Sequence, residues 1–244
     1  MWYFCLRSVV REYGWRFIAR VGAKRPWSTL RAFREAAMLD AAEGSVLVGA
    51  ARVASYAGSE RPVVGAGFCL KPLDPPCPSG RANHDCLFLE QPVGCEPVEV
   101  PLACRACTIH LLGTRSLGAG AAFYVMTSAR DILDDIFVPA MRRGAFASGL
   151  FVICRYSFRP FAFGLLASGM SGRLLPLERG DCRDYGTWLL ADRGIKDEQT
   201  TIGAGGMAEV AGSLPRAAFP DAIRVERRGN VFYPVTGGRP SETG

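Results

Sequence analysis

Two runs of almost purely apolar residues, separated by a helix-like segment, constrain the fold of this chain more than any other feature. Residues 121–127 and 149–155 are rich in aromatic, β-branched and small apolar side chains, which is typical of strands buried on both faces. The segment between them, 129–143, has apolar residues at helical spacing, although Pro139 is expected to kink or shorten that helix. Strands that alternate with helices predict an α/β fold with a mostly parallel sheet and flanking helices.

Further elements are expected on both sides of this core. Helices are predicted at 29–42 (with Ser28 as N-cap), 46–56, 107–118 and 161–168, and strands at 62–70, 173–177, 222–225 and 230–234. We therefore expect three regions, namely a helical N-terminal region at 1–69, a cysteine-rich α/β domain at 70–200 and a partly irregular C-terminal extension at 201–244.

Residues 71–103 are expected to form a long loop, because prolines and glycines crowd this part of the chain. A structureless segment of this length is uncommon in a compact domain unless it is functional. Something has to hold the loop in place. A bound metal is the leading candidate, since the loop is rich in cysteine.

The chain has nine cysteines, and five of them lie between residues 77 and 107. Cys104 and Cys107 form a Cys-x-x-Cys turn, which brings two sulfurs within reach of one metal. Two more ligands are expected from the loop, where the best candidates are Cys77 and Cys86. Less certain ligands are Cys95, Cys154 and Cys182. Such thiolates hold an iron–sulfur cluster, for instance of the 4Fe-4S type, or zinc, and inert buried cysteines are the alternative.

Cys154 and Cys182 suggest a second use of sulfur. Each follows a predicted strand, and ligands of open parallel sheets bind outside the carboxyl ends of the strands. We expect both thiols at one edge, as further ligands or as a redox pair. An alternative hypothesis is a thiol-dependent enzyme with a structural zinc, in which Cys154 or Cys86 attacks the substrate and His84 is the base. His84 is equally well explained as a solvated loop histidine, and Cys154 as a core residue.

One longer pattern joins these residues: a Cys-x-x-Cys turn, a helix, a strand, a long helix and an apolar strand that ends in cysteine. Its marked positions here are Cys104, Cys107, Ile109, Gly118 and Cys154. The pattern resembles the cysteine-rich family called domain of unknown function 116, over roughly residues 70–195. In that resemblance Cys77 and Cys86 match upstream cysteines, Cys182 matches a later Gly-x-Cys element, and Ala106 replaces a usual glycine. The resemblance implies an iron–sulfur or other metal site in a cytosolic α/β domain, with no established reaction.

The charge distribution and the targeting signals limit which classes of partner and which compartment we expect. The net charge is +6, but the basic residues are scattered rather than clustered, so we expect no nucleic-acid partner. No secretory signal is evident, which predicts a cytoplasmic protein with free thiols. Residues 1–26 combine aromatic and arginine side chains, which is typical of an amphipathic helix on a membrane surface, on a partner protein or on its own domain. The expected roles are electron transfer, sulfur or cluster handling, or enzyme maturation, with a redox or maturation partner.

Overall fold

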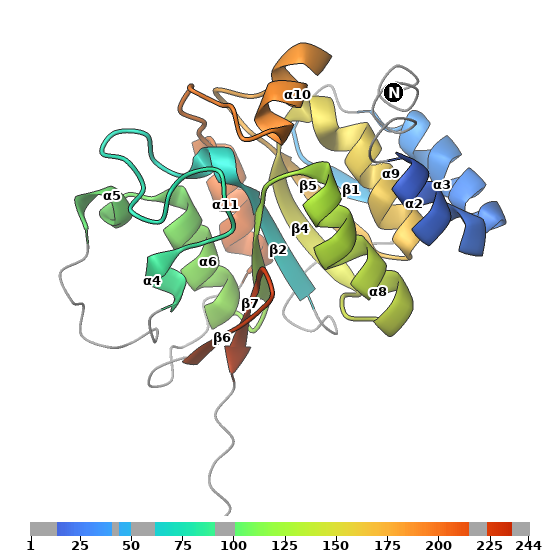
Figure 1. Ribbon diagram of the computed structural model, residues 1–244, viewed down its shortest axis with the longest axis horizontal. Helices are drawn as coiled ribbons and strands as arrows, with labels where there is room; N and C mark the ends of the chain where they lie inside the picture. Colours follow the sequence, from blue (N-terminus) through green and yellow to red (C-terminus); the bar gives the residue numbers. More distant parts are fainter. Residues whose placement is uncertain (1–13, 41–43, 50–61, 91–100, 215–223, 236–244) are drawn as a thin grey trace, which may run out of the picture.

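The computed structural model describes residues 14–40, 44–49, 62–90, 101–214 and 224–235. At its centre is a seven-stranded sheet with the strand order β1-β5-β4-β2-β3-β7-β6 (Figure 1). The strands are β1 (Val46–Val48), β2 (Pro62–Gly67), β3 (Ala122–Met126), β4 (Ser148–Ile153), β5 (Ser171–Pro176), β6 (Arg224–Arg228) and β7 (Val231–Val235). The four strands β2 to β5 run parallel, whereas β1, β6 and β7 are antiparallel to their neighbours. The predicted α/β fold with a mostly parallel sheet is confirmed.

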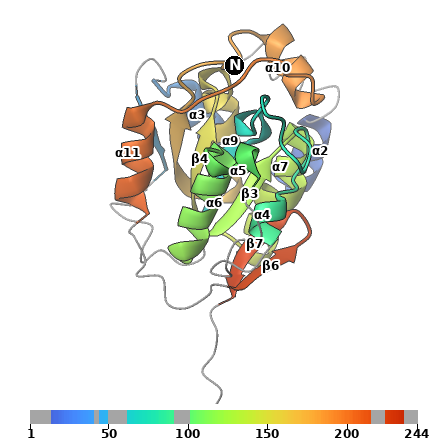
Figure 2. The same cartoon turned by 90° about the vertical axis from the view of Figure 1, so that its left-hand side faces the viewer.

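Helices cover both faces of the sheet (Figures 1 and 2). One face carries α8 (Val138–Arg143) and α9 (Phe158–Ser168), with α2 (Gly14–Arg20) and α3 (Pro26–Ala37) beside α9, and the other carries α6 (Thr108–Gly118) and α11 (Ala204–Ser213). Shorter helical segments are η2 (Gly22–Lys24), η3 (Phe68–Leu70), α4 (Leu87–Glu90), α5 (Leu102–Arg105), α7 (Ala129–Ile132), η4 (Leu133–Phe137), η5 (Arg155–Ser157) and α10 (Tyr185–Asp192). Across the described ranges, the helices are all too short or too polar to cross a lipid bilayer.

The two faces of the sheet are buried in two separate apolar clusters. In β3, Phe123 and Val125 pack toward α6, while Tyr124 and Met126 pack toward α9, because successive side chains of a strand point to opposite faces. Every residue of β3 and β4 is buried, so these strands read as unbroken apolar runs. This is why the sequence identified them clearly.

Pro139 is accommodated without a break in the helix. The chain runs from α7 through a π-helical turn at Leu133–Phe137 into α8, where Pro139 occupies the first turn. Proline is tolerated at that position because its missing N–H has no helical acceptor there. The predicted helix at 129–143 is therefore present, and the π turn absorbs the disturbance expected from the proline.

Two local predictions are wrong. Val46 begins a strand instead of a helix, because β1 pairs with the edge of β5 and its β-branched side chains suit that position. The helix predicted from residue 29 begins at Pro26, and the Ser28 hydroxyl donates to the carbonyl of Arg25 within the first turn instead of capping it. Proline at the first helical position fixes this earlier start. An amphipathic helix was also predicted at residues 1–26. Residues 1–13 of that range lie outside the described residues.

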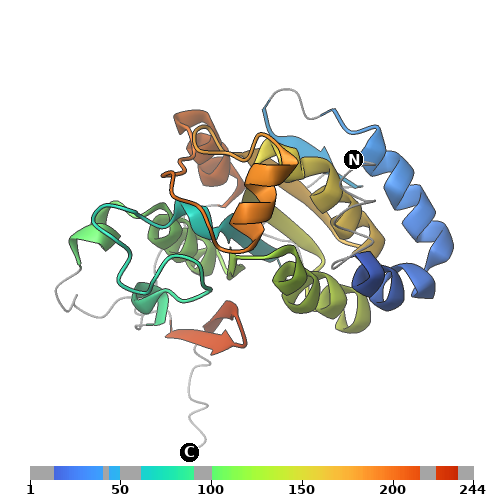
Figure 3. The same cartoon turned by 45° about the horizontal axis from the view of Figure 1, so that its top comes forward.

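The central strand β2 marks the point where the chain changes direction across the sheet. From β2 the chain passes to β3 on one side, and then to β4 and β5 on the other. All four parallel strands end at the same edge of the sheet, and Figure 3 shows α10 lying over this edge. The sheet draws strands from all three predicted regions, so the boundaries at 69/70 and 200/201 do not divide it.

Candidate functional site

The described cysteines form two groups, which we call the loop cysteines (Cys77, Cys86, Cys104 and Cys107) and the pocket cysteines (Cys69, Cys154 and Cys182). Cys95 lies outside the described residues. The loop cysteines come from the chain between β2 and α6. The pocket cysteines come from the segments that follow β2, β4 and β5. The two groups therefore have different supports in the fold.

A buried lysine holds the loop that carries Cys77 and Cys86. Lys71 is only 1% exposed. Its ammonium donates to the carbonyl oxygens of Gly80 and Asn83, each at 3.0 Å, and to the Asn83 side-chain oxygen at 2.6 Å. Burial lowers the pKa of Lys71, while nearby thiols and Asp85 act against that shift. In the described part of the chain no carboxylate forms an ion pair with this ammonium.

Arg81 completes the support of the same loop. Its guanidinium donates to the carbonyl oxygens of Lys71 at 3.3 Å, Cys69 at 3.0 Å and Glu198 at 2.8 Å, and also to that of Lys196. The loop is thus fastened to η3 and to residues 196–198 by side-chain donors. The sequence prediction that something must hold it is confirmed, and Lys71 and Arg81 provide at least part of that support.

Two loop cysteines occupy the N-termini of helices. Cys86 directly precedes α4, and the N–H groups of Leu89 and Phe88 act to lower the pKa of its thiol, although the Leu89 N–H donates to the Cys86 carbonyl oxygen at 2.9 Å. Cys107 is the N-cap residue of α6, and the nearby N–H groups of His110 and Ile109 act to lower the pKa of its thiol. Unpaired N–H groups at a helix start favour negative charge, so both positions are suited to a thiolate.

Cys107 lies within electrostatic range of each of the other three loop thiols, and Cys77 and Cys104 lie within range of each other. Burial raises the pKa of Cys86 to about 11, and the charge of Cys107 adds to that shift. Burial also raises the pKa values of Cys104 and Cys107, and Cys77 adds to both. As free thiols, Cys86, Cys104 and Cys107 are therefore neutral near pH 7, and a bound metal would be needed to ionise them together.

The candidate ligands are not arranged around a single point. In the residues that the structure describes, no group of three or more His, Cys, Asp or Glu side chains is placed to hold a metal ion. Zinc needs four ligands at about 2.0–2.3 Å from one centre. An iron–sulfur cluster spreads its thiolates over several iron atoms, so its cysteines stand further apart.

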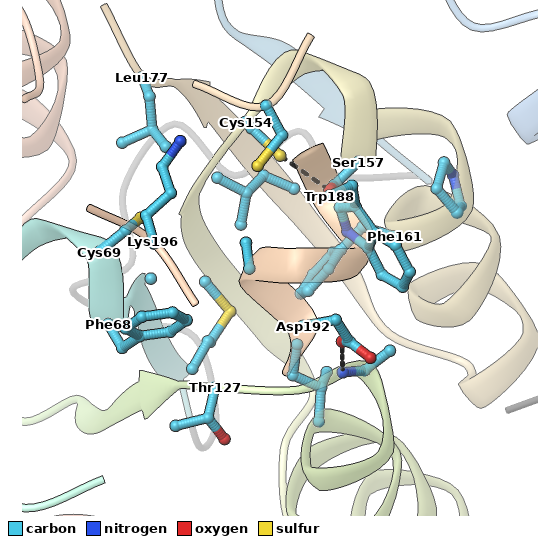
Figure 4. A pocket seen from close by; sticks show the side chains of 18 of the residues that line it. Phe68, Cys69, Thr127, Cys154, Ser157, Phe161, Leu177, Trp188, Asp192 and Lys196 are labelled. Atoms are coloured by element: carbon cyan, nitrogen blue, oxygen red, sulfur yellow. Dashed lines mark hydrogen bonds between the residues drawn. The ribbon is translucent and has the colours of Figure 1, made fainter. Parts of the chain in front are cut away.

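A pocket of about 120 Å³ opens at the carboxyl ends of the parallel strands. Its walls include Cys69, Cys154 and Cys182 together with Phe161, Trp188 and Lys196 (Figure 4). This position lies beside the direction change between β2 and β4, where ligands of open α/β sheets bind. As predicted, Cys154 and Cys182 meet at one edge of a parallel sheet.

Cys154 is surrounded by hydrogen-bond donors. The Cys182 thiol donates to the Cys154 sulfur, and the backbone N–H of Cys182 also points to it. The Ser157 hydroxyl lies 2.9 Å from the same sulfur, while the Ser157 N–H donates to the Cys154 carbonyl oxygen at 2.9 Å. These bonds, that of the Cys182 thiol first, lower the pKa of Cys154 to about 7 despite its burial. The same thiol–thiol bond, together with burial, raises the pKa of Cys182.

Cys69 and Lys196 complete the polar part of the pocket. Burial raises the pKa of Cys69, although a hydrogen bond with Thr200 and the charges of Lys196 and Arg81 oppose the shift. Lys196 is 9% exposed, and its charge also acts to lower the pKa of Cys182. Cys69 is therefore neutral at pH 7, whereas Cys154 is about half ionised.

The hydrogen-bond partners of the two histidines are oxygen atoms and not a reactive thiol. The Nδ1 atom of His84 lies 2.7 Å from the carbonyl oxygen of Val125, and Nε2 lies 3.0 Å from the Thr127 hydroxyl. Both ring nitrogens of His84 are thus occupied, which gives no support to its pairing with Cys154 as a base. His110 packs on Phe88, and its Nδ1 lies 3.0 Å from the carbonyl oxygen of Cys104.

Sequence reasoning missed four polar residues of these sites: Cys69, Lys71, Ser157 and Lys196. Cys69 could have been found, because it follows the predicted strand 62–70 in the way that Cys154 follows its own strand. Nothing in the sequence marked Lys71 and Lys196 as special, because their unusual property is burial in the folded protein. No protein family, curated protein or solved structure was found to match this chain. The resemblance to domain of unknown function 116 stays a prediction.

Proposed function

We propose that the loop cysteines hold an iron–sulfur cluster, and that the protein acts in electron transfer, in sulfur or cluster handling, or in the maturation of another enzyme. The observation that carries this proposal is the placement of Cys107, which interacts electrostatically with the other three loop thiols, while Cys77, Cys86 and Cys107 act on the buried ammonium of Lys71. A buried cation without a carboxylate partner is unfavourable, and thiolates bound to iron would supply the missing negative charge.

The backbone is arranged for the same ligand. N–H groups lie near the sulfurs of Cys86 and Cys107, and hydrogen bonds to the sulfurs tune the potential of a cluster. Lys71 would raise that potential further, since a nearby positive charge favours the more negative, reduced state. The cluster would supply one-electron transfer, and the protein would supply the charge and hydrogen bonds that set its potential.

Zinc is the weaker alternative for the same thiols. A structural zinc would need the four sulfurs to draw together around one centre, and the described side chains have no such arrangement. An iron–sulfur cluster binds its thiolates on separate iron atoms, so it does not require one common centre. We therefore favour iron over zinc at this site.

Metal analysis of the full-length protein, purified without oxygen, tests the proposal. We expect iron and acid-labile sulfide in similar amounts, and a brown colour. Replacing Cys104 or Cys107 by serine should remove both, whereas Cys182→Ser should retain them. A colourless wild-type protein without iron contradicts the proposal, and zinc with no iron supports the alternative site.

Exposed aromatic residues favour a second, separate role for the N-terminal helices. On α2 and α3, Trp15 is 72% exposed and Trp27 is 82% exposed, and arginines flank both. Tryptophan beside basic residues suits the interface of an anionic membrane. Flotation with phosphatidylserine-containing vesicles tests this role. The wild type should float, and the double variant Trp15→Ser, Trp27→Ser should not; equal behaviour of the two proteins dismisses it.

A further inference from the structure

The pocket cysteines suggest a reaction that does not depend on a metal. The pocket lies where the chain changes direction in the sheet, and its walls are mostly apolar, with contributions from Met126, Phe161 and Trp188. A volume of about 120 Å³ with mostly apolar walls suits a small organic group. The site is therefore shaped for a compact substrate with an apolar arm.

Cys154 is placed to attack such a substrate. It follows β4 directly, and its backbone enters the 3₁₀ turn η5, which brings Ser157 to its sulfur (Figure 4). The Ser157 hydroxyl lies 2.9 Å from this sulfur, and the Cys182 thiol lies beside it in the wall of the same pocket. Stabilised thiolates next to a cavity are the reactive ones, because the thiolate is the nucleophile.

Cys182 is held beside Cys154 by a fastened loop. The loop after β5 is closed at its base, where the N–H of Glu178 donates to the carbonyl of Thr201 at 2.9 Å and the Thr200 hydroxyl donates to the carbonyl of Gly180 at 3.1 Å. Gly180 has φ +64 and its Cβ would lie 2.6 Å from the Gln199 carbonyl oxygen, so the close approach needs glycine. The two thiols are thus neighbours by construction, although they are far apart in the sequence.

We propose that Cys154 and Cys182 form a thiol–disulfide exchange pair that reduces small organic disulfides bound in this pocket. In the first step the Cys154 thiolate attacks one sulfur of the substrate, forms a mixed disulfide and releases the other half as a thiolate. In the second step Cys182 gives its proton to that thiolate and attacks the Cys154 sulfur, which releases the second half as a thiolate that takes a proton from water. The proton that Cys154 released to water when it ionised balances the proton that this last thiolate takes from water. Two cysteine thiols become one disulfide, and one substrate disulfide becomes two thiols.

Lys196 favours the second step. Its charge acts to lower the pKa of Cys182, which must lose its proton in order to attack. Cys69 is the third thiol of the pocket, but it bonds to Thr200 instead of Cys154, so it is expected to take no part. This makes Cys69 a matched control within the same cavity.

The test uses the anaerobic full-length protein, bis(2-hydroxyethyl) disulfide as the small probe, and peptide mass spectrometry after acid quenching and alkylation. We expect a Cys154–Cys182 disulfide in the wild type. Cys182→Ser should accumulate a mixed disulfide on Cys154, and Cys154→Ser and Cys154→Ala should each lose the fast reaction. Cys69→Ser should still form the Cys154–Cys182 disulfide, because Cys69 supplies neither sulfur of that bond. Glutathione disulfide is larger and charged, so its reaction rate should be at most about one tenth of the rate with the small probe.

Several results would overturn the proposal. These are a wild type that forms no Cys154–Cys182 bond, a Cys182→Ser variant that accumulates no adduct on Cys154, equal labelling of Cys69, or equal rates with the two disulfides. Thermal unfolding of each variant shows whether it is folded, and the wild-type cross-link decides even if one variant is not. Iron content is measured on the same samples, so failure of this proposal is distinguished from failure of the iron–sulfur proposal.

Discussion

The loop cysteines and the pocket cysteine Cys154 carry the same thiol group, but their surroundings shift its pKa in opposite directions. The three buried loop thiols have pKa values raised by burial, so they remain neutral unless a metal replaces their protons. Cys154 is buried too, but hydrogen bonds from Cys182 and Ser157, that of the Cys182 thiol first, lower its pKa to about 7. The difference lies in how many donors reach each sulfur and in what else is nearby.

This comparison shows that burial alone does not decide what a cysteine can do. Cys107 and Cys154 are equally exposed, at 8% each. Cys107 shares its surroundings with other loop thiols and a buried lysine, whereas Cys154 faces one thiol donor and a cavity. The first arrangement suits a shared metal centre and the second suits attack on a ligand.

The largest expected effect separates the two groups completely. Cys107→Ser should lose essentially all iron and keep the fast disulfide reaction, while Cys154→Ser should keep its iron and lose the reaction. The reason is that no ligand is shared between the groups. Iron analysis and disulfide kinetics on both variants measure this, and loss of both properties in either variant breaks the distinction.

The next effect compares the two buried lysines. Lys71→Met should lower the free energy of unfolding by about 2–3 kcal/mol, because carbonyl and amide oxygens of Gly80 and Asn83 lose a charged donor. Lys196→Met should cost about 1 kcal/mol or less, because in the described residues its ammonium has no such set of acceptors. Urea unfolding of both proteins measures the difference, and equal losses would remove the special role of Lys71.

The pH dependence of Cys154 sharpens the contrast further. Alkylation requires the thiolate, so the rate at Cys154 should rise with pH, reach half its maximum near pH 7 and then level off. Ser157→Ala removes one donor and should move this midpoint upward by about 0.5–1 pH unit. Cys182, Cys69 and Lys196 face the same pocket, so their variants serve as comparisons. A midpoint above pH 8.5 in the wild type contradicts the donor arrangement.

The smallest effect concerns the outer support of the loop. Arg227 of β6 donates to Asp85 at 2.7 Å and to Glu90 at 2.5 Å, and so ties the C-terminal hairpin to the segment around Cys86. These groups are partly exposed, and water weakens the pairing. Arg227→Ala should lower stability by about 1 kcal/mol or less without changing iron content. Thermal unfolding checks the first part, and a loss of iron would show that the hairpin matters to the site.

The sequence predicted the parallel core because β3 and β4 are buried on both faces, and a doubly buried strand leaves an unbroken apolar run. It missed β1, which is short and lies at the sheet edge, where its three residues resemble the start of a helix. It also missed α10, which lies over the pocket and whose described residues are all only partly buried or exposed, so the apolar pattern there is weak. An element buried on both faces has an unbroken apolar sequence that is easy to recognise. An element buried on one face has a mixed sequence that is harder to recognise.

The candidate sites follow the same logic. The Cys-x-x-Cys turn is local, so Cys104 and Cys107 were recognised from spacing alone. The meeting of Cys154 with Cys182 followed from the parallel sheet, because strand ends converge. The hydrogen bonds of Ser157 and Cys182 to Cys154, and the burial of Lys71, depend on tertiary packing, and no local pattern of residues encodes them.

Cysteine-resolved alkylation of the anaerobic protein, before and after removal of iron by a chelator, tests the division between the two groups most directly. We predict that Cys154 reacts at once in both states at pH 8, and that Cys77, Cys86, Cys104 and Cys107 are protected until the iron is removed. Uniform reactivity of all these cysteines, or protection of Cys154 together with the loop cysteines, would contradict the account.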